Sequence, residues 1–153
     1  MVVSQLGDLS SLKWTTSPQH LESDHDYDVY YCGLNFKDVM LASGKLPSSA
    51  FDERLEIPIG GEFSGISTSG QRVMGYLGLN QKTKIKLKSC SRHHIWEIPE
   101  EWSLAEAATV PVVYMTAILA LVIRGQIKTG HRVLIHSGSG GGGHVDNRDC
   151  SGF

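Results

Sequence analysis

The residues with the clearest potential for chemistry form the glycine-rich segment SGSGGGG at positions 137–143. The apolar, strand-favouring run HRVLIHSG leads into it. Glycines let a backbone approach a pyrophosphate closely, and a helix that begins there offers free N–H groups and a favourable dipole. Gly138, Gly140 and Gly143 satisfy the spacing G-x-G-x-x-G, which is a weak signal by itself. With the preceding run, the segment favours a dinucleotide phosphate loop over a flexible glycine tail.

The residues after the glycines do not continue as a phosphate loop requires. HVDNRD, positions 144–149, has no apolar face and no helical period, yet the loop needs a following helix to hold its glycines in place. The codons for residues 146–151 can be read in a shifted frame that begins at the second base of each codon. With serine encoded as AGY, this frame encodes mainly Ile, Thr, Ala and Val, which suit an apolar helix. We therefore hypothesise a frameshift or a mis-spliced gene sequence after the glycines, either of which makes residues 144–153 an aberrant tail.

Composition and charge argue against several classes of partner. With 41% hydrophobic residues, 20% charged residues and a net charge of −2, the chain is typical of a soluble globular protein without a global attraction to nucleic acid or anionic membranes. The run KTKIKLK, positions 82–88, favours a solvated edge strand over a basic binding stripe. The apolar run 110–123 is too short to cross a bilayer. We expect no nucleic-acid partner and no membrane segment.

The cysteines and histidines do not indicate a metal site. Three cysteines lie far apart, and no Cys/His ligand spacing is present, so neither a disulfide framework nor zinc is indicated. A reduced cytoplasmic setting fits this pattern best. We expect Cys32 to be a packed strand thiol, and His93 and His94 to lie on the surface.

The elements that must position the glycines begin with a β-rich part. Residues 1–26 are weakly patterned, with Trp14 as their only large anchor. Residues 27–112 contain short strands, a short helix closed by Gly44 and a loop over 46–60, which together favour a small glycine-rich barrel. The expected strands are DYDVYYCGLNF, GGEFSGIS, QRVMGYLG, KIKLKS and HHIWEIP.

The pattern becomes helical after residue 102. Ser103 and Glu106 form a capping box, which predicts a helix. VVYMTAILALVIRG, positions 112–125, is apolar all round and predicts a second helix buried on most faces. HRVLIHSG, positions 131–138, has the continuous apolar centre of a central parallel strand. Residues 113–143 therefore predict the start of an α/β domain.

Several strings of the chain together resemble the enoyl reductase region of animal fatty acid synthase, in the medium-chain dehydrogenase/reductase superfamily. The resemblance covers about residues 27–141. It implies a mixed β and α/β fold, in which an incomplete GroES-like β-barrel (27–112) is followed by the first strand and phosphate loop of a truncated Rossmann domain (113–143). The strings are YYCGLNFKDVMLASGKL, IGGEFSG, GQRVMG, WEIPEEWSLAEAATVPVVYMTA and ALVIRGQIKTGHRVLIHSGSGG.

The resemblance also implies a reaction. NADPH supplies a hydride to the β-carbon of an enoyl thioester carried on an acyl carrier domain, the α-carbon is protonated, and the parent protein is a homodimer. Most of the cofactor domain and the downstream proton donors have no counterpart in this chain, so we expect the fragment to be inactive in isolation. The alternatives are a quinone or alkenal oxidoreductase of the same superfamily, or a non-catalytic interaction module.

Carried over residue by residue, the resemblance predicts two parts of a cofactor site. Asn35 and Thr116 fall at positions that contact the nicotinamide end in the family. From the residues alone, two alternatives stay open: Asn35 is a helix cap, and Thr116 is a helix residue whose hydroxyl binds its own backbone. Zinc members of the superfamily carry a Cys where Asn35 stands and a His where Gly61 stands, so we expect no catalytic zinc. The phosphate loop comprises Ser137, Gly138, Ser139, Gly140, Gly141, Gly142 and Gly143.

Overall fold

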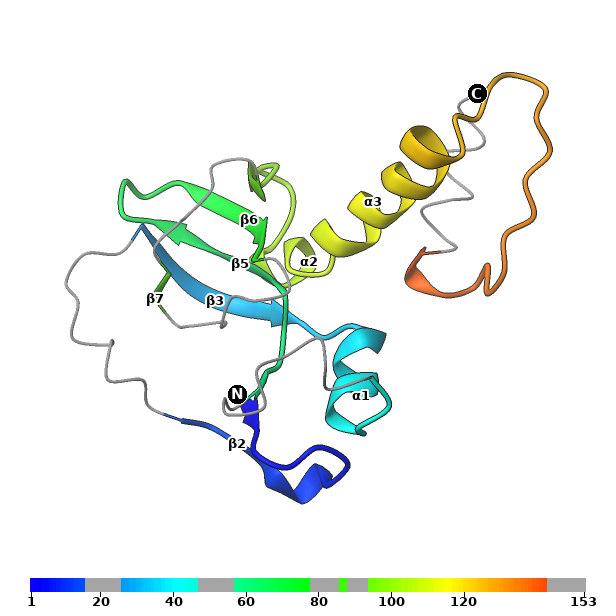
Figure 1. Cartoon of the computed structure of the whole chain (residues 1–153). Helices are drawn as coiled ribbons and strands as arrows, with labels where there is room; N and C mark the ends of the chain where they lie inside the picture. Colours follow the sequence, from blue (N-terminus) through cyan, green and yellow to red (C-terminus); the bar gives the residue numbers. More distant parts are fainter. Residues whose placement is uncertain (16–25, 47–56, 78–85, 88–93, 143–153) are drawn as a thin grey trace. The chain divides into compact units, whose positions relative to one another are not determined.

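Two units divide the chain, residues Met1–Thr109 and Val110–Phe153. The structure is a computed structural model that describes residues 1–15, 26–46, 57–77, 86–87 and 94–142. Antiparallel strands dominate the first unit, as Figure 1 shows. In the second unit, the described residues form a helical segment and a coil.

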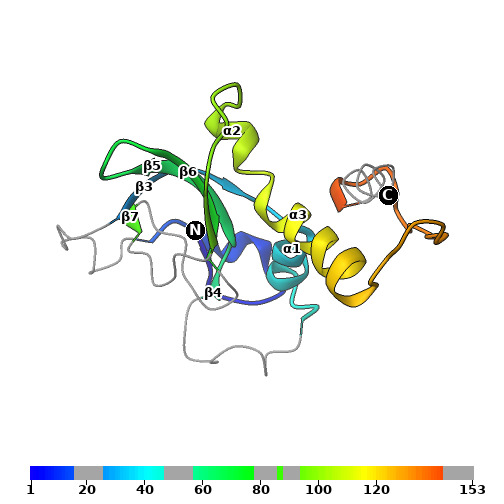
Figure 2. The ribbon, with the colours of Figure 1, turned by 90° about the horizontal axis from the view of Figure 1, so that it is seen from above.

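A five-stranded antiparallel sheet forms the centre of the first unit, and Figure 2 shows its strands from above. All five strands lie where the sequence predicts them. Strands β7 and β8 are the edges, so the sheet does not close within the described residues, in agreement with an incomplete barrel. In spatial order the strands are β7 (Lys86–Leu87), β3 (Tyr27–Gly33), β5 (Glu62–Ser67), β6 (Arg72–Tyr76) and β8 (Ile95–Glu97).

One face of this sheet carries the larger core. Phe63 is fully buried and packs with Val73 and Leu77. The ring of Tyr27 lies 6.1 Å from that of Phe63, centroid to centroid. Cys32, by contrast, is exposed, so the prediction of a packed thiol is wrong. On this strand the apolar contacts with the core are made by Tyr27 and Val29.

A second, three-stranded sheet contains the N-terminus. Its order is β2 (Leu12–Lys13), β1 (Val2–Val3), β4 (Ile57–Pro58), so β4 arises in a segment that the sequence predicts as loop. Pro58 fits an edge strand because proline has no N–H to donate. Trp14 is 80% exposed, and the prediction that it anchors this segment is wrong. Val2 and Val3 are the buried residues instead, because β1 is the central strand.

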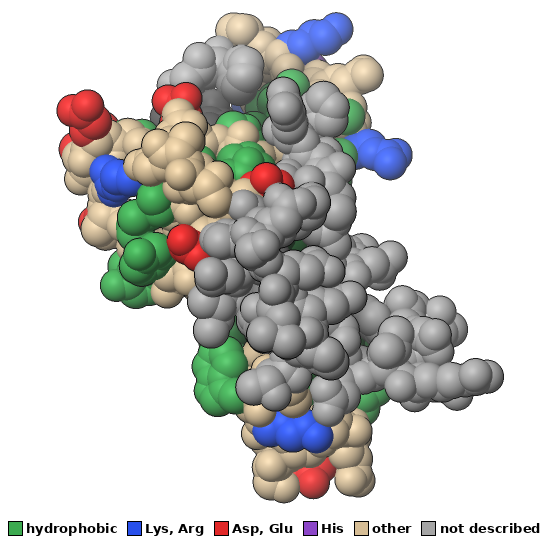
Figure 3. All heavy atoms as spheres, turned by 90° about the vertical axis from the view of Figure 1, so that its left-hand side faces the viewer, with side chains coloured by type: hydrophobic (Ala, Val, Ile, Leu, Met, Phe, Trp, Pro, Cys, Tyr) green, Lys and Arg blue, Asp and Glu red, His purple; other side chains and the backbone are tan. Residues whose placement is uncertain are grey.

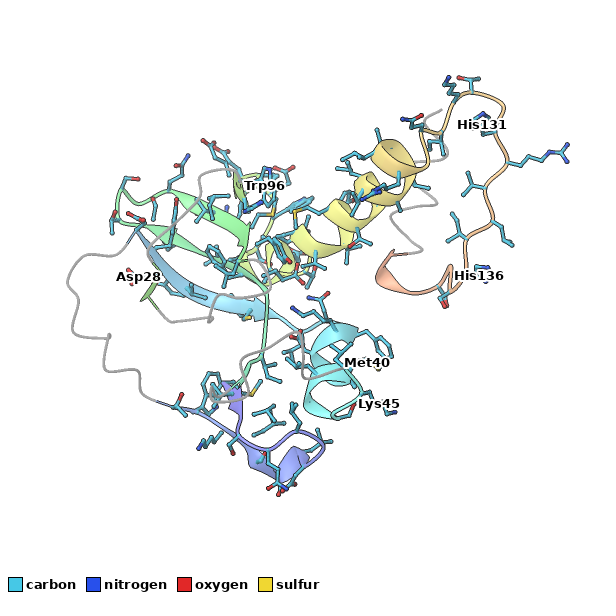
Figure 4. The ribbon with its side chains drawn as sticks, viewed as in Figure 1. Asp28, Met40, Lys45, Trp96, His131 and His136 are labelled. Atoms are coloured by element: carbon cyan, nitrogen blue, oxygen red, sulfur yellow. The ribbon has the colours of Figure 1, made fainter. Side chains whose placement is uncertain are left out.

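Helix α1 (Phe36–Ala42) follows β3 after two residues. Gly44 has φ 68°, a left-handed conformation that favours glycine and ends the helix where the sequence predicts. Ala42 packs with Val3 and Ile59 in the second core cluster, so the helix is fixed against the smaller sheet. Met40 and Lys45, labelled in Figure 4, lie on the helix and on the turn behind it.

The predicted capping box forms at helix α2 (Leu104–Ala107). The Ser103 N–H and hydroxyl donate to the Glu106 carboxylate at 2.8 and 2.7 Å, and the Glu106 N–H donates to Ser103 Oγ at 3.2 Å. The buried Ser64 hydroxyl on β5 donates to the Leu104 carbonyl at 2.5 Å. This bond attaches the short helix to the five-stranded sheet.

In the second unit, α3 (Pro111–Ala117) continues into the π-helix η5 (Ile118–Arg124). The Gly125 N–H donates to the Ala120 carbonyl at 2.8 Å, which is the five-residue spacing of a π-helix. A helix is confirmed here, but the prediction that most of its faces are buried is wrong. Four apolar side chains of η5 are between 46% and 59% exposed: Ile118, Leu119, Val122 and Ile123.

Residues 131–135 do not form the strand that their apolar pattern predicts. They lie in a coil that is visible between the labels His131 and His136 in Figure 4, and Leu134 is 82% exposed. A central parallel strand is stabilised by neighbours on both sides. The described residues of this unit contain no strand with which residues 131–135 could pair. Their apolar pattern alone is therefore not sufficient to form a strand.

The described surface has no dominant charge on the side drawn in Figure 3. Single acidic and basic side chains lie there among hydrophobic and neutral ones. Among the helices that the structure describes, none combines the length and apolarity that a bilayer crossing needs.

Candidate functional site

The junction between β3 and α1 holds the first predicted site residue, Asn35. It is the N-cap of α1, with the extended backbone angles φ −110° and ψ 161°. The Asp38 N–H donates to the Asn35 carbonyl at 2.9 Å, which begins the helix. The Asn35 side chain also faces the Asp38 N–H in a capping box. The capping role that the sequence leaves open for Asn35 is therefore present.

Asp38 fixes the backbone of this junction. Its carboxylate is 3% exposed and accepts hydrogen bonds from the N–H groups of Asn35 and Gly60 at 2.8 and 3.0 Å. Hydrogen bonds to an ionised acceptor are stronger than those between neutral groups. Asp38 consequently links the start of α1 to the chain that enters β5.

Glu62 holds the side chain of Asn35. Its carboxylate is only 2% exposed, and Oε1 accepts a hydrogen bond from Asn35 Nδ2 at 2.8 Å. Glu62 stands opposite Gly33 in the pairing of β5 with β3. An ideal Cβ at Gly33 would lie 2.5 Å from Glu62 Oε1 and 2.6 Å from the Ala108 carbonyl oxygen. The carboxylate therefore occupies space that only a glycine at position 33 leaves.

Lys37 lies beside the same corner of the fold. Its ammonium nitrogen is 3.4 Å from the position of an ideal Cβ on Gly61, the residue that stands where zinc relatives carry histidine. Within the described ranges, no group of three or more His, Cys, Asp and Glu side chains has a metal-binding arrangement. The absence of catalytic zinc stays a prediction that rests on Asn35 and Gly61.

Thr116 lies in α3, in the second unit, whereas Asn35 lies in the first. Its hydroxyl donates to the Val112 carbonyl one turn earlier, at 2.7 Å. This is the helix-backbone bond that the sequence leaves open as an alternative for Thr116. A hydroxyl that donates to its own helix still has lone pairs to offer, so contact with a nicotinamide stays a prediction.

The predicted phosphate loop begins as a tight turn. Ser137 has φ 57°, a conformation uncommon outside glycine, and the Gly140 N–H donates back to the Ser137 carbonyl at 2.9 Å. Gly141 and Gly142 follow with helical backbone, and an ideal Cβ on Gly142 meets nothing within 4 Å. Gly143 and the tail 144–153 lie outside the described residues. The phosphate-binding role of the segment stays a prediction.

Sequence reasoning did not single out the two acids that organise this site. Asp38 sits three residues after Asn35, the spacing of a capping box, and this signal was available. Glu62 follows two glycines at the start of a strand. A carboxylate in a segment that is otherwise suited to burial was the sequence signal for its role. Burial of an acid is unusual unless it is hydrogen-bonded.

A cavity of about 520 Å³ lies at the opposite end of β3 and β5, where Tyr27 pairs with Ser67. Its lining is mixed and includes the acids Asp26 and Glu97. It contains none of the predicted site residues, so the Asn35 corner remains the better candidate in the first unit.

Comparison with known proteins gives sequence relatives of two kinds. The chain is 38% identical over 116 residues to a phenolphthiocerol synthesis polyketide synthase type I of Mycobacterium marinum, covering 72% of this chain and 5% of that protein. It is 36% identical over 130 residues to quinone oxidoreductase-like protein 2 of Bos taurus, covering 76% of this chain and 35% of that protein. No protein-family model matches the sequence.

Solved structures match over almost the whole chain. CurK enoyl reductase superposes with a TM-score of 0.80 at 27% identity, covering 98% of this chain and 50% of that one. The quinone oxidoreductase of Coxiella burnetii gives a TM-score of 0.79 at 26% identity, covering 99% and 52%. The chain thus spans about half of each solved structure and a smaller part of the curated relatives. By fold, the chain corresponds to about half of a medium-chain dehydrogenase/reductase protein, the superfamily that its sequence resembles.

Proposed function

We propose that the chain is part of an NADPH-dependent enoyl-thioester reductase of the fatty acid synthase type. The observation that carries this proposal is the match to CurK enoyl reductase across 98% of the chain. The polyketide synthase relative supports the same chemistry, because polyketide and fatty acid synthases both process thioesters. The strings LASGKL, EFSG, RVMG and LIHSGSGG support the fatty acid synthase type within that group.

The described residues fit a nicotinamide dinucleotide at two places. Asn35 offers an amide whose orientation is fixed by Glu62. The turn from Ser137 to Gly140, followed by helical backbone, is exposed over most of its length. Accessible backbone N–H groups at the start of a helix suit a pyrophosphate. The solved yhdH oxidoreductase of Salmonella enterica, whose fold is similar at a TM-score of 0.62, is in complex with NADP.

Bound NADPH would supply a hydride to the β-carbon of the enoyl thioester, and the α-carbon would take up a proton. In this proposal Asn35 and Thr116 orient the nicotinamide, and residues 137–143 bind the pyrophosphate. Neither task requires a side chain to gain or lose a proton. The substrate is an acyl chain on a carrier domain of the same synthase, which acts as a cytoplasmic homodimer.

The test compares substrates with the full-length protein that carries this chain. NADPH oxidation is followed with a crotonyl thioester and, separately, with a benzoquinone. We expect kcat/KM for the thioester to exceed that for the quinone at least about tenfold, the factor that a difference of one good hydrogen bond in the transition state produces. Equal or faster quinone reduction would contradict the proposal.

A quinone oxidoreductase is the second candidate function. It is favoured by the Bos taurus relative and by the Coxiella burnetii structure, which match this chain about as well as the enoyl reductase does. The genomic sequence beside this segment separates the two candidates. Dehydratase-like and carrier-domain coding sequences indicate a synthase, whereas a short separate gene indicates a quinone-type enzyme.

A further inference from the structure

We propose that Glu62 is a positioning residue that fixes which end of the Asn35 amide faces the nicotinamide. This inference rests on the proposed function, because it takes the nicotinamide carboxamide as the partner of Asn35. The juxtaposition that carries it is the 2.8 Å hydrogen bond from Asn35 Nδ2 to Glu62 Oε1, made by a carboxylate that is 2% exposed.

The chemistry of the two groups settles the orientation of the amide. An ionised carboxylate only accepts hydrogen bonds, whereas an asparagine amide has a donor end and an acceptor end of nearly equal shape. Asn35 must therefore present its NH2 group to Glu62, so its carbonyl oxygen Oδ1 is directed away from the carboxylate. A carbonyl oxygen is the group that accepts from the NH2 of a nicotinamide carboxamide. The start of α1 favours the same orientation, because the Asp38 N–H faces the Asn35 side chain in the capping box, and Glu62 supplies the acceptor that the NH2 end requires.

The surroundings of Glu62 hold its carboxylate in place. β5 lies between β3 and β6, so the Glu62 backbone is fixed on both sides. Gly33 leaves space for Oε1 where any Cβ would be 2.5 Å away, and Phe63, the next residue, is fully buried in the core. A buried side chain on a central strand has few alternative rotamers, so it can act as a rigid acceptor.

Asp38 has a different task at the same corner. Its carboxylate accepts hydrogen bonds from the backbone N–H groups of Asn35 and Gly60, and its own backbone N–H faces the Asn35 side chain in the capping box of α1. The two carboxylates thus have different roles. That of Asp38 fixes the backbone of Asn35, and that of Glu62 binds its side-chain amide. Of the two carboxylates, only that of Glu62 is expected to act on the cofactor through the Asn35 side chain.

A double-mutant cycle in the full-length protein tests this inference. The variants are Asn35→Ala, Glu62→Ala and the double variant, with Glu62→Gln as the conservative substitution that keeps a side-chain acceptor. We expect each alanine variant to raise the KM for NADPH about tenfold, the effect of losing one oriented hydrogen bond, with the KM for the thioester changed less than about twofold. Because Glu62 acts through Asn35, the double variant should show no further rise. Glu62→Gln keeps an acceptor but adds a donor, so it selects the orientation less strictly and should raise the KM for NADPH only about two- to threefold.

A matched control separates this role from a structural one. Ser64→Ala removes another buried polar group on β5, the hydroxyl that donates to Leu104, and should lower Tm without changing the KM for NADPH. If Glu62→Ala does not fold, the side-chain NH2 resonances of Asn35 provide the second measurement. In the wild type one amide proton should be protected from exchange, and Glu62→Gln, which keeps a side-chain acceptor, should retain that protection.

The outcomes are distinguishable. A wild type that neither binds NADPH nor reduces thioesters overturns the proposed function, and the cofactor role of Glu62 with it. An active wild type in which Glu62→Ala leaves the KM for NADPH unchanged, or raises it equally in the Asn35→Ala background, overturns this inference alone. Unprotected, freely exchanging Asn35 amide protons in the wild type also overturn it.

Discussion

Substitution of Gly33 by alanine tests the geometry on which the candidate site depends. Gly33 is not among the glycines with positive φ, so the substitution acts through space and not through backbone strain. The added Cβ would lie 2.5 Å from Glu62 Oε1 and 2.6 Å from the Ala108 carbonyl oxygen. Contacts this short require one of the two groups to move. Both are buried or attached to backbone, so neither can move freely.

The magnitude follows from two contributions. Forcing a methyl group into a well-packed site costs about 1–3 kcal/mol. Displacing the Glu62 carboxylate from Asn35 adds about 1.5–3 kcal/mol, the range for a hydrogen bond to a charged group. Gly33→Ala should therefore lower the free energy of unfolding by about 2.5–6 kcal/mol. Gly61→Ala is the matched control, because its Cβ would lie 3.4 Å from the flexible Lys37 ammonium and 3.6 Å from Tyr76 Cε2, an ordinary van der Waals distance. It should change stability by less than about 0.5 kcal/mol.

Urea unfolding followed by circular dichroism measures both variants. With a slope of about 1–3 kcal/mol per molar urea, the midpoint of Gly33→Ala should fall by roughly 1–3 M while that of Gly61→Ala hardly changes. Equal midpoints for the two variants would refute the close packing of Glu62 against Gly33, and with it the account of the site.

Three further substitutions have distinct expected results. Phe63→Ala empties the centre of the larger core, where Phe63 is 0% exposed, and should lower the free energy of unfolding by about 3–5 kcal/mol; a loss below 1 kcal/mol in thermal or urea unfolding contradicts this packing. Hydrogen bonds from the Ser103 N–H, and then from its hydroxyl, lower the pKa of Glu106. A carboxyl group whose pKa is lowered on folding stabilises the fold above its unfolded pKa, and this contribution disappears as the pH falls through the lower folded pKa. Ser103→Ala should move the pKa of Glu106 back towards its ordinary value and weaken this acid dependence, which an NMR titration measures. An unmoved pKa argues against the capping box. Ser139→Glu places a negative charge in the exposed glycine segment and should weaken NADPH binding at least about tenfold with Tm unchanged. The control variant Ser139→Ala should bind NADPH with an affinity within about twofold of the wild type. Equal affinities for both variants, measured by nicotinamide fluorescence, would show that the pyrophosphate binds elsewhere.

Local signals in the sequence predict the β-rich part well. Tyr27–Gly33 and Arg72–Tyr76 are strands because β-favouring residues alternate between turns, and Gly44 ends a helix because its φ of 68° favours glycine. The capping box at Ser103 was predicted for the same reason: its determinants lie within four residues. Such features need no knowledge of the rest of the chain.

Features that depend on distant partners were missed or wrong. The β-pattern of residues 131–135 could not form a strand without neighbours, and the apolar residues of η5 are exposed for the same reason. Val2 and Val3 are buried because β1 pairs with residues 57–58 as well as with β2, and because Val3 packs against Ala42 and Ile59. Glu62 was missed as a site residue because its role arises from the pairing of β5 with β3, which lie about thirty residues apart in the chain.

The most direct test of the proposed reaction is the fate of labelled hydrogen. The full-length protein is incubated with a crotonyl thioester and NADPH that carries deuterium at the C4 position of the nicotinamide, and the product is analysed by NMR and mass spectrometry. The account predicts a saturated acyl thioester with one deuterium at the β-carbon and a solvent proton at the α-carbon. Recovery of unreduced thioester, in a sample that reduces a quinone with the same NADPH, would contradict it.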